Sequence, residues 1–116
     1  VYTFEQTRKI YRCLNRNTKS IISIFAGRMA DQGKDPIPIF KKSIRLTKNS
    51  KNIEILWAST REAYNYTQAK QLNCNIITIP PKIINKINSF GKNYQKLTLD
   101  TVKGFLSDSK KSRFKF

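Results

Sequence analysis

The sequence predicts an α/β fold in which parallel strands alternate with helices. Three short apolar runs, at residues 21–25, 53–58 and 76–79, begin 32 and 23 positions apart, the length of a strand followed by a crossover helix. The runs are apolar on both faces, as in strands of a parallel sheet covered by helices. The stretches between them carry apolar residues at helical spacing.

The chain begins with a helix and the first complete strand. Tyr2 and Thr3 would be the tail of a strand, and Thr3 would cap a helix over Phe4 to Asn15 with Gln6 completing a capping box. The helix has an apolar stripe opposite its arginines and lysine. A polar turn leads to the strand Ile21 to Phe25.

The second unit has clear boundary signals. Residues 27–34 are small and polar and predict a loop. Asp35 and Pro36 suit the N-cap and first position of a helix that runs to Lys48, because proline lacks only an N–H group that would be unpaired there. A turn then precedes the strand Ile53 to Ala58, in which Trp57 is expected to pack in the core.

The third unit opens at Ser59, which matches a capping box with Glu62 before a helix over Ala63 to Leu72. The strand Ile76 to Ile79 follows and ends at two prolines. A short amphipathic helix comes next. Thr98 would then cap a last helix with four apolar side chains facing inward, at Leu99, Val102, Phe105 and Leu106.

The bulk properties describe one small domain of 116 residues with a net charge of +16. Such charge attracts nucleic acid or anionic lipid, but the lysines are scattered and no arginine-rich tract occurs. A small basic α/β module that binds nucleic acid without chemistry is therefore the alternative function. No apolar run approaches the roughly 20 residues of a membrane span, and no signal peptide is visible.

Two cysteines, Cys13 and Cys74, are too few and too far apart for a metal framework, and the chain has no histidine. A disulfide between them is possible, but two free buried thiols in a cytosolic protein are the better interpretation.

Polar and cationic residues follow two of the predicted strands. The first strand leads through Gly27 to Arg28, and the second leads to Ser59 and Arg61. The carboxyl ends of parallel strands meet at one edge of the sheet, where α/β folds bind their ligands. Because the planar fork of arginine suits phosphate, the sequence predicts one shared anion site.

Each of these residues also has a simpler interpretation. Arg28 would pair with Asp31 on the surface, and Ser59 would serve only as a helix cap. A cap nevertheless exposes a helix N-terminus that attracts phosphate. Arg61 opposes the dipole in the first turn, which indicates another reason for its presence. Ser23 lies inside a strand and either hydrogen-bonds in the core or points into a barrel mouth, and the pattern leaves both open.

No catalytic centre is visible in the sequence. The predicted strands carry no lysine, histidine or cysteine nucleophile, and nothing marks Asp31, Asp35 or Glu62 as an acid/base pair.

Four stretches resemble, in order, the transaldolase family. Residues 23–31, Ser-Ile-Phe-Ala-Gly-Arg-Met-Ala-Asp, are similar to its strand-six signature S-P-F-V-G-R-I with an acidic loop. Residues 57–61, Trp-Ala-Ser-Thr-Arg, resemble the strand-seven motif A-S-F-R, and residues 75–81 resemble the strand-eight stretch D-I-V-T-V-P-P. Residues 2–6 resemble the segment after strand five. Ile24, Ala26 and Thr60 depart from the family's Pro, Val and Phe and leave the anion ligands intact.

The resemblance implies that residues 1–116 form the C-terminal half, strands 5 to 8, of a TIM barrel. The full enzyme would be a class I aldolase or transaldolase that acts on a sugar phosphate through a Schiff base, with no metal or cofactor. In this family the serines and arginines after strands six and seven hold the substrate's phosphate, and those roles carry over to Ser23, Arg28, Ser59 and Arg61.

The resemblance also implies what this chain lacks. The family's lysine comes from strand four and its acid/base carboxylates from strands one and three, all of which would lie before Val1. We therefore expect no catalytic residue and no activity from the chain alone, which is shorter than the roughly 250 residues of a full barrel. The full-length protein is expected to be a cytoplasmic homo-oligomer with no specific nucleic-acid or membrane partner. A catalytically dead relative that binds sugar phosphates is a further possibility.

Overall fold

The computed structural model describes residues 1–112 of the chain. Strands β1 (Ser20–Phe25), β2 (Ile53–Ala58) and β3 (Ile76–Ile77) form a parallel sheet in that order. The helices are α1 (Phe4–Cys13), α2 (Ala26–Asp31), α3 (Ile37–Thr47), α4 (Tyr64–Gln71), α5 (Pro81–Ile87) and α6 (Tyr94–Ser112). The predicted α/β class with parallel strand–helix units is confirmed.

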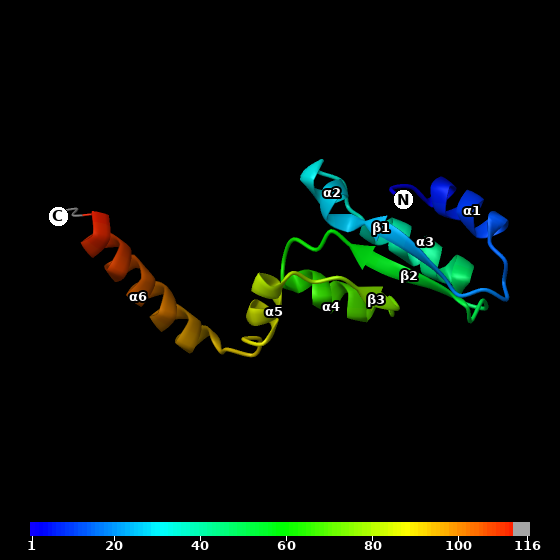
Figure 1. Ribbon diagram of the computed structural model, residues 1–116. Coiled ribbons are helices and arrows are strands. Elements are labelled where there is room, and N and C mark those ends of the chain that lie inside the picture. The colour runs from blue at the N-terminus through cyan, green and yellow to red at the C-terminus, as the bar shows by residue number, and fades with distance from the viewer. Residues whose placement is uncertain (113–116) are drawn as a thin grey trace.

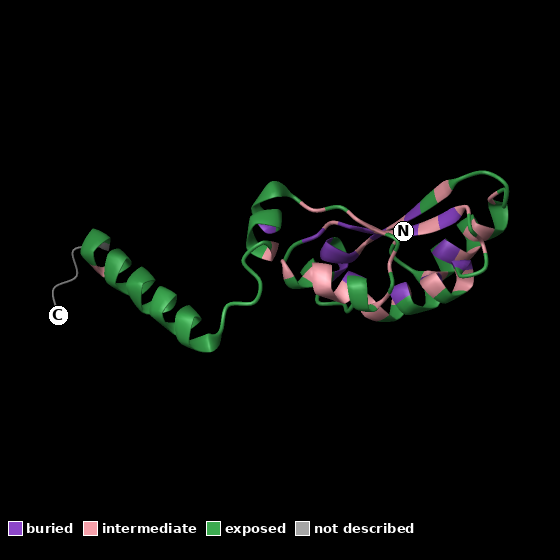
Figure 2. Cartoon of the chain, turned by 90° about the horizontal axis from the view of Figure 1, so that it is seen from below, coloured by how far each residue is buried: buried purple, intermediate pink, exposed green. Residues whose placement is uncertain are grey.

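The core lies between the sheet and its helices. Residues on one face of β1 and β2 are buried, and Trp57 on this face stacks on Phe40 of α3 with ring centroids 4.5 Å apart. Figures 1 and 2 show the sheet with α3 and α4 along one side of it. The opposite face is open, and Ile21 there is 55% exposed. The packing of Trp57 in the core agrees with the sequence interpretation.

Helix α1 packs on α3 through a buried pair of hydroxyl groups. The Ser43 hydroxyl donates to Thr7 Oγ1 at 3.3 Å, and the Thr7 hydroxyl donates to the carbonyl oxygen of Thr3. The predicted capping box of Thr3 and Gln6 is present in full. These bonds leave no buried hydroxyl of the pair without a partner, which keeps their burial inexpensive.

The chain start pairs with β1 in the manner of a parallel strand. The Val1 amino group donates to the Ser23 carbonyl oxygen at 2.6 Å, and the Phe25 N–H donates to the Val1 carbonyl oxygen at 3.2 Å. Val1 thus lies beside β1 on the edge that β2 does not occupy, whereas Tyr2 and Thr3, expected to be the tail of a strand, form no strand and lead into α1.

Several boundaries differ from the sequence prediction. Residues 27–34 were expected to be a loop, but most of them belong to α2, since small side chains allow a helical turn to start directly after β1. The Asp35 carboxylate accepts from the Ile37 N–H at 3.0 Å, as a capping group does, and α3 begins one residue later than expected. Strand β3 is only two residues long because its pairing to β2 ends before the prolines.

The C-terminal helix begins earlier and packs less than predicted. The capping residue is Asn93 rather than Thr98, because Asn93 Oδ1 accepts a hydrogen bond from the Lys96 N–H at 2.8 Å. The four apolar residues expected to face inward are 48–70% exposed, because α6 extends away from the rest of the chain and contacts no other element there (Figure 1). The expected inward packing of α6 is therefore wrong.

Both cysteines are free, as expected, but Cys13 is exposed and Cys74 is only partly buried. The expectation of two buried thiols is wrong for Cys13, which lies on the solvent side of the last turn of α1. None of the helices formed by residues 1–112 combines the length and the hydropathy needed to cross a membrane.

Candidate functional site

The loops after β1 and β2 meet at the carboxyl edge of the sheet. Gly27, in the first turn of α2, packs directly against the segment after β2. A Cβ atom at Gly27 would overlap the Ser59 carbonyl oxygen and would lie 2.7 Å from Arg61 Cγ and 2.8 Å from Ser59 Oγ. Only glycine fits this approach, so the small residue before Arg28 allows the two loops to touch.

The turn at residues 59–62 has a different structure from the predicted capping box. Helix α4 starts at Tyr64 without a side-chain cap, and Ser59 is in the left-handed region with φ of +63°. The residue that accepts from this turn is Asn65, whose Oδ1 receives the Arg61 N–H at 3.1 Å and the Glu62 N–H at 2.9 Å. The assignment of Ser59 and Glu62 as a capping pair is wrong, because Asn65 takes their place.

Arg61 is held by an acid from the neighbouring loop. Its Nη2 lies 2.9 Å from Asp31 Oδ2, and this bond, with the charge of the carboxylate, raises the pKa of Arg61. The two side chains are 47% and 53% exposed, so the pair remains open to solvent and to a competing anion. The simpler interpretation of the sequence paired Asp31 with Arg28. In the structure, Asp31 pairs with Arg61 instead.

Arg28 projects into a different hollow. It is exposed on α2, with its Cζ atom 5.5 Å from the centroid of the Phe25 ring. It lines a hollow of about 510 Å³ with Tyr2, Met29 and Lys34. The structure therefore brings Arg28 to the correct edge of the sheet but does not place it in one hollow with Arg61.

Ser59 and Arg61 line a hollow of about 340 Å³ together with Thr78 and Pro80, between the ends of β2 and β3. Arg61 also borders a smaller hollow of about 160 Å³ behind the turn, with Gly27 and Trp57 among its walls. Ser23 is partly buried on the open face of β1, paired in register with Leu56. Ser23 alternates with the buried Ile22 and Ile24, so it does not hydrogen-bond in the core. The other interpretation, that it points into a barrel mouth, stays a prediction.

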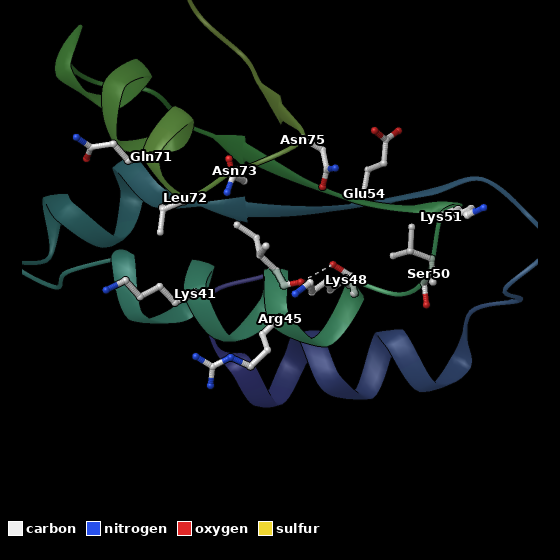
Figure 3. A pocket seen from close by; sticks show the side chains of 13 residues that line it. Lys41, Arg45, Lys48, Ser50, Lys51, Glu54, Gln71, Leu72, Asn73 and Asn75 are labelled. Atoms are coloured by element: carbon white, nitrogen blue, oxygen red, sulfur yellow. Dashed lines mark hydrogen bonds between the residues drawn. The ribbon is translucent and has the colours of Figure 1, made fainter.

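Another hollow, of about 610 Å³, lies at the opposite end of the strands (Figure 3). It is bordered by Lys41, Lys48, Lys51 and Asn73, between the end of α3 and the start of β2. Figure 3 shows the labelled lysines directed to different sides of the hollow. Because they do not converge, and because ligands of parallel sheets bind at the carboxyl edge, this hollow is not the candidate site.

The comparison with known families decides the family. The family model described as transaldolase/fructose-6-phosphate aldolase matches residues 1–116. This chain belongs to the transaldolase/fructose-6-phosphate aldolase family. A search among curated proteins finds no match. Membership in an enzyme family that handles sugar phosphates gives the alternative of a nucleic-acid-binding module no support.

In this transaldolase-family chain, hydrogen-bond donors and positive charge gather at the carboxyl edge of the sheet. Arg61 and the Ser59 hydroxyl are donors on one turn, and Arg28 adds charge at the same edge. Strands β1, β2 and β3 contain no lysine. Within residues 1–112, no three histidine, cysteine, aspartate or glutamate side chains gather as a metal site would require.

Two features of the site escaped the sequence interpretation. Asn65 was read as an ordinary helix residue, although asparagine often hydrogen-bonds main-chain groups of a nearby turn. The Asp31 pairing crosses 30 residues of sequence, and no local pattern distinguishes Arg28 from Arg61 as its partner.

Proposed function

We propose that this chain supplies the phosphate-binding part of a transaldolase-like enzyme. Ser59 and Arg61 bind the phosphate of a sugar phosphate in the hollow between β2 and β3. Ser23 from β1 and Arg28 from α2 belong to the same proposed site, although Arg28 lines a separate hollow in this structure and would have to turn toward Arg61. The support is the family match over residues 1–116 together with the contact of Gly27 with Ser59 and Arg61. That contact is the observation that carries the proposal, because it joins the two signature loops.

Physically, the site is an anchor. A guanidinium donates two parallel hydrogen bonds to a phosphate, and the serine hydroxyl adds a third donor. Holding the far end of a sugar phosphate orients its carbonyl group toward the reacting amine and reduces the entropy lost in reaching the transition state. An anchor of this kind raises the rate without taking part in bond making.

The chemistry proposed for the complete enzyme is Schiff-base formation. A lysine amine adds to the ketose carbonyl and water leaves, which gives an iminium group that stabilises the carbanion formed on C–C cleavage. Since β1, β2 and β3 have no lysine, the lysine comes from a segment other than these strands. The resemblance assigns this lysine to strand four of the barrel, which none of β1, β2 and β3 represents, so the chain alone is expected to bind the substrate without turning it over.

The proposed architecture is a (β/α)8 barrel in which β1, β2 and β3 are strands 6, 7 and 8. Two observations support it. One face of the sheet is covered by helices and the other is open, as the wall of a barrel requires. Val1, which directly precedes the residues that resemble the segment after strand five, also hydrogen-bonds to β1 in parallel fashion, as the end of a neighbouring strand would. Association of the two halves, a homo-oligomeric state and a cytoplasmic location belong to the same proposal.

The test is direct binding of fructose 6-phosphate and of inorganic phosphate to the intact chain, measured by calorimetry at about 150 mM salt. Arg61→Ala is expected to weaken binding about ten-fold, the effect of losing a charge-assisted pair. Arg28→Ala and Ser59→Ala are expected to weaken it less. Arg45→Ala, which removes the same charge from α3 at the other end of the sheet, is the matched control.

The outcomes separate the parts of the proposal. If Arg61→Ala and Arg45→Ala bind equally well, the attraction is that of a +16 chain for any anion and the site is wrong. If Arg61→Ala weakens binding and Arg28→Ala does not, Arg28 is not part of the site, and the assignment of Ser59 and Arg61 is retained. Borohydride reduction in the presence of fructose 6-phosphate is expected to give no covalent adduct with this chain.

A further inference from the structure

The turn that carries Ser59 and Arg61 has little intrinsic reason to keep its shape. Ser59 is a non-glycine residue at φ +63°, a conformation that costs of the order of 1 kcal/mol and persists only where surrounding contacts enforce it. Glu62, which the sequence suggested as the stabilising partner, is exposed and contributes its main-chain N–H rather than its carboxylate. The restraint must come from another residue.

Asn65 supplies that restraint. Its Oδ1 accepts from two successive main-chain amides, those of Arg61 and Glu62, at 3.1 and 2.9 Å. Its Nδ2 donates to Gln68 Oε1 at 2.9 Å, one turn further along α4. Because two main-chain donors require the oxygen on their side, the orientation of the carboxamide is fixed by the fold. The turn is therefore tied to a helix rather than free in solvent.

Three contacts together fix Arg61 from different sides. Asn65 holds its main chain, the Asp31 carboxylate holds its guanidinium, and Gly27 packs against its Cγ. The guanidinium uses one N–H in the bond to Asp31, and an arginine has five, so donors remain for an anion. The arrangement resembles a binding group held ready by its supporting residues.

We propose that Asn65 is a positioning residue of the anion site, which holds the main chain of Arg61 and Glu62 in the shape that presents Arg61 to phosphate. The inference rests on the proposed function for its ligand, but its structural part stands on the hydrogen bonds alone. Asn65 does not touch the ligand. Its effect passes through the geometry of Arg61.

The variant that tests the proposal is Asn65→Ala, compared with Asn65→Asp and Glu62→Gln. Alanine removes the acceptor, whereas aspartate keeps an oxygen for both amides, loses the donation to Gln68 and adds a negative charge that repels a bound anion. Glu62→Gln removes a charge from the same turn without removing any side-chain hydrogen bond that holds it, and is the matched control. Gln68→Ala is a milder second variant, because it removes the group that accepts from Asn65.

The first readout is independent of any ligand. Amide hydrogen exchange by NMR is expected to accelerate at Arg61 and Glu62 in Asn65→Ala, with Asn65→Asp close to the original chain and Gln68→Ala between them. Unchanged exchange at both amides would overturn the positioning role. Circular dichroism and the fluorescence of Trp57, the single tryptophan of the chain, check that the core is intact.

The second readout is the dissociation constant for fructose 6-phosphate. Asn65→Ala is expected to raise it about five-fold, Asn65→Asp to restore part of the affinity, and Glu62→Gln to leave it within two-fold. If Arg61→Ala weakens binding and Asn65→Ala does not, the positioning role is wrong and the anion site stands. If Arg61→Ala has no effect, the anion site itself is wrong, and the exchange data alone then decide whether Asn65 shapes the turn.

Discussion

Helix α3 and helix α6 both carry an apolar stripe, more pronounced in α3, but only the stripe of α3 is buried. Phe40 in α3 is fully buried against Trp57, whereas Phe105 in α6 is 70% exposed. Both helices are amphipathic by sequence. The difference is that α3 lies on the sheet, whereas α6 extends away from the sheet and its helices over the residues that the structure describes (Figure 1). An apolar stripe predicts that a helix has a face to bury, and only a partner surface makes that face a core.

The sharpest test of this comparison is the same substitution in both helices. Phe40→Ala removes a stacked, fully buried ring and is expected to lower the free energy of unfolding by about 3–5 kcal/mol. Phe105→Ala is expected to change it by less than about 0.5 kcal/mol. Urea unfolding followed by Trp57 fluorescence measures both. Equal losses would show that α6 is packed in solution and that the comparison is mistaken.

Glycine to alanine gives a second matched pair. At Gly27 the new methyl group would overlap the Ser59 carbonyl oxygen, so Gly27→Ala is expected to cost about 1–3 kcal/mol and to disturb the anion site. At Gly104, inside α6, nothing lies within 4 Å and the change should stabilise the helix by about 0.5–1 kcal/mol. The urea midpoint reports Gly27→Ala, and helical circular dichroism with amide exchange within α6 reports Gly104→Ala, because α6 lies outside the core that the urea midpoint follows. Tolerance of alanine at Gly27 would remove the contact that joins the two loops.

The sequence predicted the regular elements well where local patterns determine them. The strand Ile53–Ala58 has the expected bounds, and the Thr3–Gln6 capping box is present, because both depend on residues close together in the chain. The loop expected at residues 27–34 is largely helix, since tertiary contact with the turn at Ser59 stabilises a glycine-containing helix that propensity alone disfavours. Local sequence patterns also could not predict whether α6 packs against the rest of the chain.

The candidate site shows the same limit. Arg28, Ser59 and Arg61 were located at the carboxyl edge because a parallel sheet gathers its strand ends there. Which acid pairs with which arginine, and that Asn65 rather than Glu62 holds the turn, depend on contacts between separate loops. Spacing along the sequence carries no information on these contacts. The phosphate-binding roles of Ser23, Arg28, Ser59 and Arg61 are predictions that the binding experiment tests.

Removal of α6 extends the comparison to the whole helix. A chain that ends at Asn93 is expected to unfold at the same urea midpoint as residues 1–116, within about 0.5 kcal/mol, because the buried core residues all lie before α6. The loss should appear only as a decrease in helical circular dichroism. A lower midpoint for the shortened chain would mean that α6 covers part of the sheet in solution.

The smallest effect concerns the link between α6 and the segment before it. Lys92 Nζ lies 2.9 Å from Asp100 Oδ2, and this hydrogen bond lowers the pKa of Asp100 below its ordinary value. A lowered pKa in the folded chain means that the ionised carboxylate is favoured by folding. This contribution is present above the ordinary pKa of aspartate and is lost as the pH falls through the lowered value.

Lys92→Ala is therefore expected to raise the pKa of Asp100 toward its ordinary value, as followed by a carbon NMR titration of the carboxyl group. Because both partners are exposed, screening keeps the effect on stability small, and the unfolding midpoint at neutral pH should not change measurably. Lys86→Ala, an exposed lysine on α5, is the control of equal charge. If the pKa of Asp100 is the same in all three chains, Lys92 does not hold Asp100 in solution, and α6 is joined to the body by the peptide chain alone.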